Sequence, residues 1–191
     1  MKPAGRPRDP DIDEAIRKAA RRNLAIFGVE AMSISTIAME AETTRQSVYR
    51  RWPSKEHLAA AAVLDVATIG TAVTTDDAYA DFLHELQDFA TFTTAPTETS
   101  LVGTVLQDCI VPEIRAGYRT AVVAPRRARL KVILEQAKSA KLIDADGEIE
   151  TAISMATGAW YARALAQDDT PTRWADKVAR LTWRALGGRD A

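Results

Sequence analysis

A dense set of hydrogen-bond donors lies between Thr44 and Lys55, in a segment whose apolar residues are spaced as in a helix. Val48 and Trp52 lie four positions apart and would face inward together, which leaves the polar side chains on the other faces. Arginine and glutamine match the hydrogen-bonding edges of guanine and adenine, whereas hydroxyl and ammonium groups suit phosphate oxygens. Recognition of a DNA duplex is therefore the chemistry that this segment could perform.

The predicted DNA contacts divide by position on the helix. Side chains near the N-terminus of a helix in the major groove reach base edges. Arg45, Gln46 and Ser47 are the candidates there, and Arg50, one turn further on, is the alternative. Contacts to phosphates are expected from five residues with hydroxyl or ammonium groups: Ser33, Thr36, Thr44, Tyr49 and Lys55.

Two short helices joined by a tight turn would hold these side chains. Ser33 has the side chain of an N-cap and is followed by apolar residues at helical spacing, among them Ile37. Thr44 can cap the second helix in the same way. Pro53 disfavours helical geometry at Trp52, so the second helix should end there.

The run from Val48 to Leu58 reads Val-Tyr-Arg-Arg-Trp-Pro-Ser-Lys-Glu-His-Leu. It resembles the signature of the TetR family of one-component bacterial regulators, in which a Tyr, two polar residues and an aromatic residue precede Ser-Lys-Glu. The pair Ile37-Ala38 also falls where the family has the same pair. One departure is Glu42, because the family usually has glycine in this turn. A residue other than glycine costs about 1 kcal/mol if the position is left-handed.

The resemblance implies a dimeric, ligand-responsive transcriptional regulator, with repression as the usual mode. Two copies would bind a palindromic double-stranded DNA operator through the helix-turn-helix. A small apolar effector bound by the C-terminal part would then release them. Neither a cofactor nor a metal ion is expected.

The remaining chain also has helical periodicity and no convincing alternating strand pattern, so the predicted fold class is all-α with about nine helices. We expect a helix-turn-helix DNA-binding domain at residues 1–57 and a helical effector-binding and dimerisation domain at residues 58–191. The first domain begins with a basic arm, which would either contact DNA or remain solvated. Beyond residue 53 the expected helices span roughly 54–73, 77–94, 98–110, a stretch to 141 with a kink or restart at Pro125, 148–167 and 171–186.

The last two helices are apolar over more than one face, whereas a helix on a core needs only one stripe. The surplus indicates packing against a second copy, and the resemblance also implies a homodimer through these helices. The predicted interface residues are Ile153, Ala156, Trp174, Val178, Leu181 and Trp183. A further apolar set is predicted either to line an effector pocket or to be ordinary core: Phe82, Leu86, Phe89, Val105, Leu106, Cys109 and Trp160.

The chain of 191 residues has a formal net charge of −1, but the charges are unevenly distributed. Residues 1–57 hold 11 basic and 8 acidic side chains, against 14 and 18 in the rest. A basic N-terminal part suits DNA binding at one end. No secretory signal is visible, and no apolar stretch approaches the roughly 20 residues of a membrane span, so a cytoplasmic location is predicted.

Two other classes of protein remain open. A small helical enzyme or metal-binding bundle would need nucleophiles or ligands at suitable spacing. The chain has only two histidines, His57 and His84, and no Gly-x-Ser-x-Gly turn or phosphate loop, so an enzyme is not expected. A helical adaptor that binds another protein through its apolar C-terminal helices is the other class. Salt-sensitive binding to duplex DNA would distinguish a regulator from both.

Overall fold

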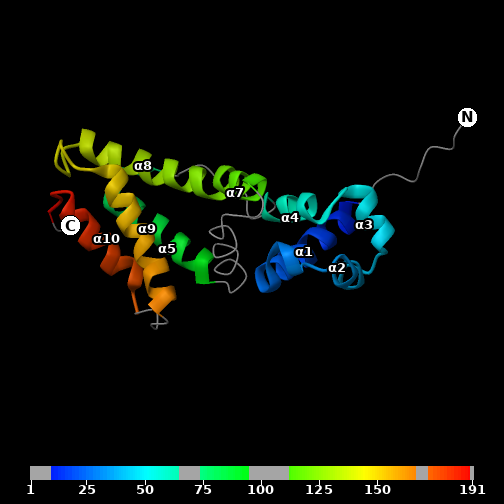
Figure 1. The fold of residues 1–191 in the computed structure, drawn as a ribbon. Helices are drawn as coiled ribbons and strands as arrows, with labels where there is room; N and C mark the ends of the chain where they lie inside the picture. The colour runs from blue at the N-terminus through cyan, green and yellow to red at the C-terminus, as the bar shows by residue number, and fades with distance from the viewer. Residues whose placement is uncertain (1–9, 65–73, 95–111, 167–171, 190–191) are drawn as a thin grey trace, which may run out of the picture. The chain divides into compact units, whose positions relative to one another are not determined.

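The computed structural model describes residues 10–64, 74–94, 112–166 and 172–189. Every regular element in these ranges is helical (Figure 1), and the predicted all-α fold class is confirmed. Contacts divide the chain into two compact units: unit 1 comprises residues 1–68 and 96–122, and unit 2 comprises residues 69–95 and 123–191. The helix predicted at 98–110 lies outside the described residues.

Unit 1 is built on α1 (Pro10–Ala31), which packs against α2 (Ile34–Glu40) and α4 (Lys55–Leu64). In addition, α2 contacts α3 (Arg45–Arg51), and α4 contacts α7 (Pro112–Tyr118). Helix α4 thus packs within unit 1. The domain boundary predicted after residue 57 stays a prediction. The core of unit 1 consists of fully buried aliphatic side chains from α1 to α4: Ile16, Leu24, Ile37, Val48 and Leu58.

Gly28 interrupts α1 near its C-terminal end. Its φ of 70° and ψ of 176° are not helical, and a side chain is rarely compatible with that φ. The chain turns there, and Val29 and Met32 re-enter the core with exposed fractions of 6% and 5%. The glycine therefore sets the path by which α1 leads into α2.

A short π-helical segment, η1 (Arg119–Val123), lies between α7 and α8 (Ala124–Ser139). Pro125 explains its position, because proline has no N–H to donate and its ring clashes with the carbonyl four residues earlier. The widened turn thus precedes the proline, and a regular helix resumes at Ala124. The predicted restart at Pro125 is confirmed.

Unit 2 packs α5 (Ala78–Thr94) against α8, α9 (Ile149–Ala166) and α10 (Trp174–Ala185), and α9 also contacts both α8 and α10 (Figure 1). Helix α10 begins at Trp174, after Arg173 in a left-handed conformation with φ of 58°. The predicted start at Pro171 is therefore wrong: residues 172 and 173 form a turn, and the left-handed Arg173 keeps the helix from beginning before Trp174. Fully buried side chains from three of the helices fill the core: Phe82, Leu86, Ile133, Leu134 and Ile153.

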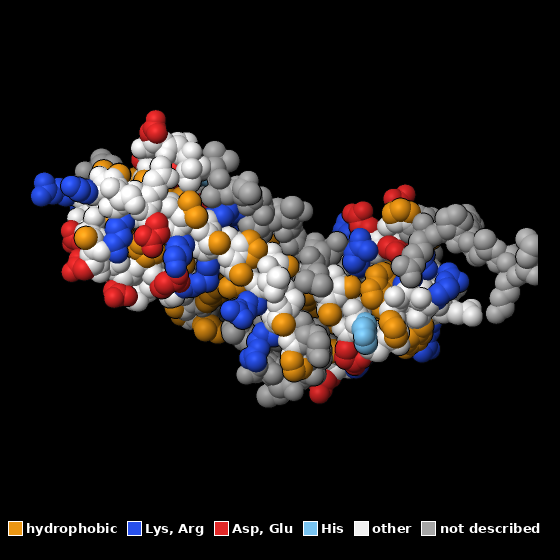
Figure 2. All heavy atoms as spheres, turned by 90° about the horizontal axis from the view of Figure 1, so that it is seen from above, with side chains coloured by type: hydrophobic (Ala, Val, Ile, Leu, Met, Phe, Trp, Pro, Cys, Tyr) orange, Lys and Arg blue, Asp and Glu red, His pale blue; other side chains and the backbone are white. Residues whose placement is uncertain are grey.

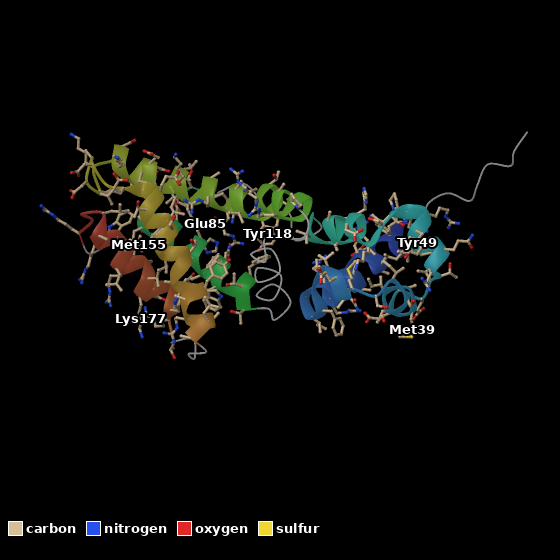
Figure 3. The ribbon with its side chains drawn as sticks, viewed as in Figure 1. Met39, Tyr49, Glu85, Tyr118, Met155 and Lys177 are labelled. Atoms are coloured by element: carbon tan, nitrogen blue, oxygen red, sulfur yellow. The ribbon has the colours of Figure 1, made fainter. Side chains whose placement is uncertain are left out.

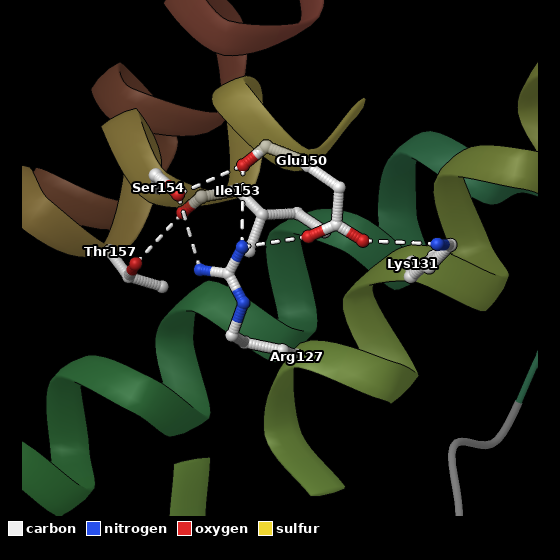
Figure 4. A network of polar contacts seen from close by, with 6 residues as sticks. All are labelled: Arg127, Lys131, Glu150, Ile153, Ser154 and Thr157. Atoms are coloured by element: carbon white, nitrogen blue, oxygen red, sulfur yellow. Dashed lines mark hydrogen bonds and ion pairs between the residues drawn. The ribbon is translucent and has the colours of Figure 1, made fainter. Parts of the chain in front are cut away.

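An exposed polar network joins α8 to α9 (Figure 4). Arg127 donates through Nη2 to Glu150 Oε2 at 2.8 Å and through Nη1 to Ser154 Oγ at 3.2 Å. Lys131 Nζ lies 3.0 Å from Glu150 Oε1. The hydrogen bonds from Arg127 and Lys131 hold the pKa of Glu150 below its ordinary value. Because the group is exposed, solvent screens these charges and the network contributes little to stability.

A second ion pair, between α5 and α8, is sheltered from solvent. Arg129 donates to Glu85 Oε2 from Nε at 3.0 Å and from Nη2 at 2.8 Å. The two side chains are only 12% and 9% exposed. Glu85 lies on α5 and is labelled in Figure 3. Such a pair holds the two helices in one register, because neither charge can be left buried alone.

The surface mixes acidic and basic side chains. On the face that Figure 2 shows, both kinds lie among hydrophobic side chains, in keeping with a net charge of −1. Among the described helices, none combines the length and the apolar character needed to cross a membrane.

Candidate nucleic-acid interface

Both helices of the predicted helix-turn-helix begin with the caps that the sequence predicts. Ser33 Oγ accepts a hydrogen bond from Thr36 N at 3.2 Å, ahead of α2. Thr44 Oγ1 accepts from Ser47 N at 3.1 Å, ahead of α3. Each cap satisfies a backbone donor that has no partner within its own helix. The caps matter because α2 and α3 are each seven residues long and would not form alone.

The turn between the two helices closes with a left-handed residue. Thr43 N donates to Ala38 O at 2.8 Å and Glu42 N donates to Met39 O at 3.1 Å, the two bonds of a Schellman motif. Glu42 has a φ of 49°, in the region that glycine adopts without strain. The left-handed conformation that the sequence analysis considered at Glu42 is therefore present.

Replacing Glu42 by glycine should raise the free energy of unfolding by about 1 kcal/mol, because a side chain is strained in the left-handed region. Lys141 offers a matched control, since it ends α8 in the same motif with φ of 61°. Lys141→Gly should give a similar gain. Only Glu42→Gly removes a negative charge from the helix-turn-helix, so it alone should strengthen binding to DNA.

Denaturant unfolding and a DNA titration of both glycine variants would check this. A loss of stability in Glu42→Gly would contradict the argument. Equal DNA binding by the two variants would show that the Glu42 carboxylate lies too far from the duplex to matter.

A buried asparagine that the sequence analysis overlooked anchors α2 to α1. Asn23 is 4% exposed, and its Oδ1 accepts a hydrogen bond from Ser33 N at 2.9 Å. Nearby, Arg22 Nη2 pairs with Glu40 Oε2 at 2.7 Å on the surface. In the sequence, the only indication that Asn23 has a structural role is its place as a polar residue on the apolar face of α1. Its partner lies too far along the chain to be inferred from spacing.

The start of α3 presents polar side chains to solvent. Arg45 and Gln46 are exposed, and neither forms a side-chain hydrogen bond with any described residue. Tyr49 is 44% exposed and projects from α3 (Figure 3). Arg50 is also exposed, with Nη2 at 3.5 Å from Ser47 Oγ. Four of the predicted contact residues are therefore available to a ligand on one short helix.

Arg51 behaves differently from its neighbours and corrects the expectation that it lies on an outer face. Its side chain is 7% exposed and its Nε pairs with Asp13 Oδ1 on α1. Its Nη1 donates to Ser47 O at 3.1 Å and to Ser47 Oγ at 2.6 Å. The predicted base contact Ser47 is thus half-buried, and its hydroxyl already accepts a hydrogen bond within the chain.

The end of α3 follows the sequence prediction. The helix stops at Arg51, and Trp52 is extended with φ of −126° and ψ of 114°, as Pro53 requires. Ser54 Oγ accepts from His57 N at 3.4 Å. Lys55, predicted to hold a phosphate, donates from Nζ to Glu30 O at 2.6 Å. This bond gives the lysine a structural partner at the end of α1.

The residues predicted for an effector pocket are in part core residues. Phe82, Leu86, Phe89 and Trp160 are each at most 7% exposed and belong to the apolar cluster of unit 2. Val105, Leu106 and Cys109 lie outside the described residues. The Nε1 of Trp160 is buried and has no hydrogen-bond partner within the described part of the chain.

The predicted dimer interface needs correction. Ile153, Ala156, Trp174 and Trp183 are each at most 5% exposed, because they fill the core of their own unit. Val178 is half-buried, and Leu181 is 63% exposed. The two helices do have apolar residues on a second face, but the predicted interface residues lie mostly on the inward one. The outward apolar residues include Met155 at 58% and Leu165 at 86% exposed (Figure 3 labels Met155).

Comparison with known families matches both parts of the chain. The family model for bacterial regulatory proteins of the tetR family matches residues 16–62, which include α2 and α3. A model described as the tetracyclin repressor-like C-terminal domain matches residues 73–182, more than half of the chain. The chain belongs to the TetR family. Members of this family are DNA-binding transcription factors rather than enzymes, so the helix-turn-helix described above is the DNA-binding part of a regulator.

Similar proteins agree with this TetR assignment. An uncharacterised HTH-type transcriptional regulator, YdeS of Bacillus subtilis strain 168, is 29% identical over 172 residues, covering 86% of this chain and 84% of YdeS. A TetR family transcription regulator from Marinobacter aquaeolei VT8 has a TM-score of 0.69 at 21% identity and covers 95% of this chain and 98% of its own. The fatty acid degradation regulator FadR from Bacillus halodurans has a TM-score of 0.71 at 14% identity, with 96% and 100% covered. The two structures support the TetR fold.

Proposed function

We propose that the chain is a dimeric transcriptional repressor that binds a palindromic operator through α3 and leaves it when a small apolar effector binds unit 2. The observation that carries this proposal is the exposed pair Arg45 and Gln46 at the start of α3, behind the Thr44 cap. These two side-chain types read guanine and adenine edges in the major groove. Two such helices on a dimer would meet half-sites about 34–36 Å apart.

The phosphate contacts of the proposal come from residues around this pair. Thr44 and Tyr49 are exposed, and Ser33, Thr36 and Lys55 are half-buried. We keep residues 1–57 as the proposed DNA-binding domain and residues 58–191 as the proposed effector and dimer domain. A protein that acts on DNA works where the DNA is, so the cytoplasm remains the expected location.

The proposed effector site lies beside Trp160 in unit 2. Trp160 packs edge-on against Trp174 at 5.2 Å between ring centroids, and Phe89 lies edge-on to Tyr161 at 5.9 Å. Among the residues that the structure describes, none accepts a hydrogen bond from the buried Trp160 Nε1, and an unpaired buried N–H is uncommon in a folded protein. An apolar effector with one acceptor atom would satisfy it. The effector can release the operator only if it binds the released and bound forms with different affinity.

Selection from a random DNA duplex library, followed by measurement of affinity against salt concentration, tests the proposal. A palindromic winner whose affinity falls steeply with salt is expected, because binding to phosphates releases counterions. The winning duplex can then be used to screen small apolar molecules for release. If no sequence is enriched, the chain does not recognise an operator under these conditions and the proposal fails.

Arg45→Ala should lower affinity for the selected operator by about 1–3 kcal/mol and relax the preference at one base position. The loss should be much smaller on random duplexes, because a base contact is specific and a phosphate contact is not. Arg180→Ala, at an exposed arginine on α10, is the matched control and should change neither quantity. Equal losses on every duplex would remove Arg45 from the base-reading set.

A further inference from the structure

A buried ion pair fastens the last residue of α3 to the first turn of α1. The Arg51 guanidinium pairs through Nε with Asp13, and its Nη1 donates to the carbonyl and hydroxyl oxygens of Ser47 at 3.1 and 2.6 Å. The side chains of Arg51 and Asp13 are 7% and 20% exposed. The planar guanidinium therefore bridges two helices with its donors in a fixed arrangement.

The position of this bridge matters because α3 is short. A seven-residue helix has little stability of its own and is held mainly by its contacts. Val48 is fully buried and anchors α3 at one point, but a single apolar contact permits rotation about the helix axis. Arg51 lies three positions later and supplies a second anchor on the same side. Two anchors fix the direction in which Arg45 and Gln46 point.

We infer that Asp13 and Arg51 are positioning residues for operator recognition, with Ser47 as part of their bridge rather than a reader of bases. This inference rests on the proposed function, since it needs an operator to be recognised. Neither residue contacts DNA in this arrangement. Base-edge contacts need side chains held within about 0.5 Å and 10–20° of the productive geometry. Loosening the bridge should therefore reduce discrimination between sequences more than binding to phosphates.

The decisive quantity is the ratio of operator affinity to random-duplex affinity, measured for the full chain at a temperature where circular dichroism reports an intact fold. Asp13→Asn keeps the shape but removes the charge, and we expect the ratio to fall about tenfold, the equivalent of one lost base contact. Arg51→Lys keeps the positive charge but loses the planar set of N–H donors of the guanidinium, so the affinity ratio should fall by a similar factor. Asp13→Glu keeps a carboxylate at this position, so its affinity ratio should lie between those of Asp13→Asn and the wild type. Random-duplex affinity should stay within about twofold in all three, because phosphate contacts are retained.

The exposed pair between Arg22 and Glu40 provides the matched control. It also joins α1 to the helix-turn-helix, but its side chains are 49% and 32% exposed. Glu40→Gln should leave the affinity ratio unchanged. If Asp13→Asn and Arg51→Lys lower the melting temperature while the ratio stays constant, the bridge is only structural and the inference is wrong.

Two substitutions separate an effect on discrimination between sequences from an effect on stability. Arg51→Lys retains a cation beside Asp13 and is the milder change, so it decides the matter if Asp13→Asn does not fold. A wild-type chain that enriches no operator would overturn the proposed function and this inference together. An operator that is bound with equal discrimination by wild type and Arg51→Lys would overturn only the inference.

Discussion

Replacing Glu85 by alanine should lower the free energy of unfolding of unit 2 by about 3–5 kcal/mol, because it removes one partner of a buried ion pair. Arg129 makes two hydrogen bonds to a single oxygen of Glu85, and both side chains are largely shielded from water. Without the carboxylate, the guanidinium loses two charge-assisted hydrogen bonds and a nearby countercharge at a site where its side chain is only 12% exposed. Thermal or denaturant unfolding of the variant would measure the effect.

Two comparisons test the reason for this loss. Glu150→Gln breaks the exposed network with Arg127 and Lys131, so it should cost much less than Glu85→Ala. The double variant Glu85→Leu with Arg129→Met should recover most of the stability, because an apolar pair of similar volume often replaces a buried ion pair without loss. A Glu85→Ala variant no less stable than Glu150→Gln would mean that water reaches the buried pair.

The helix-turn-helix could be predicted closely from sequence because its determinants are local. Ser33 and Thr44 each cap a helix three residues before the donor that they accept from. Pro53 acts on its immediate neighbour, and Gly28 interrupts α1 through its own φ. None of these effects depends on a distant part of the chain, so the periodicity and the cap residues were sufficient.

The contacts that could not be predicted join residues far apart in the chain. Arg51 and Asp13 are 38 positions apart, and Arg129 and Glu85 are 44 apart. A basic residue on a helix with other basic residues is indistinguishable in sequence from a DNA contact. Only packing decides that Arg45 is exposed while Arg51 is buried, because the side of α3 that carries Val48 also carries Arg51.

Because packing between distant residues could not be predicted, most of the dimer-interface residues predicted on α9 and α10 lie instead in the core of their own chain. Both helices are apolar on two faces, and the sequence does not state which face meets the chain's own core. Large residues such as Trp174 and Trp183 were assigned to a second copy, but they form the core with Ile153. The smaller and less continuous outward set was overlooked, since single exposed apolar residues are common on any surface.

That outward set supports a dimer surface with a regular pattern. On α9 it follows spacings of three, four and three, as in the seam of a coiled coil: Met155, Gly158, Ala162 and Leu165. On α10 it comprises Val178, Leu181 and Ala185. A Cβ atom added to Gly158 would meet no atom within 4 Å in the described part of its own chain beyond the neighbouring residues and the backbone of its helix. TetR-family regulators act as dimers, and we propose that two copies of this surface meet.

Leu181→Asp should convert the dimer to monomers and weaken operator binding by about 100- to 10,000-fold, because each half-site would then be bound without the help of the other. Leu181 is 63% exposed, so the substitution should leave the fold of a single chain intact. Light scattering after size exclusion would give the mass, and a duplex titration would give the affinity. Val132→Asp on α8, at an apolar residue that is 54% exposed, should change neither.

Gly158→Leu should have opposite effects on dimerisation and on the stability of a single chain, so it distinguishes the two more clearly than Leu181→Asp. Leucine has a higher helix propensity than glycine, so a single chain should become more stable by about 0.5–1 kcal/mol. At a close contact between two copies, the same side chain would hold the helices apart and weaken association. A variant that is stabilised and monomeric would support the proposed surface, because damage to the fold could not explain why light scattering gives the mass of a monomer. If both Gly158→Leu and Leu181→Asp remain dimeric and bind the operator as tightly as wild type, two copies must meet through another surface.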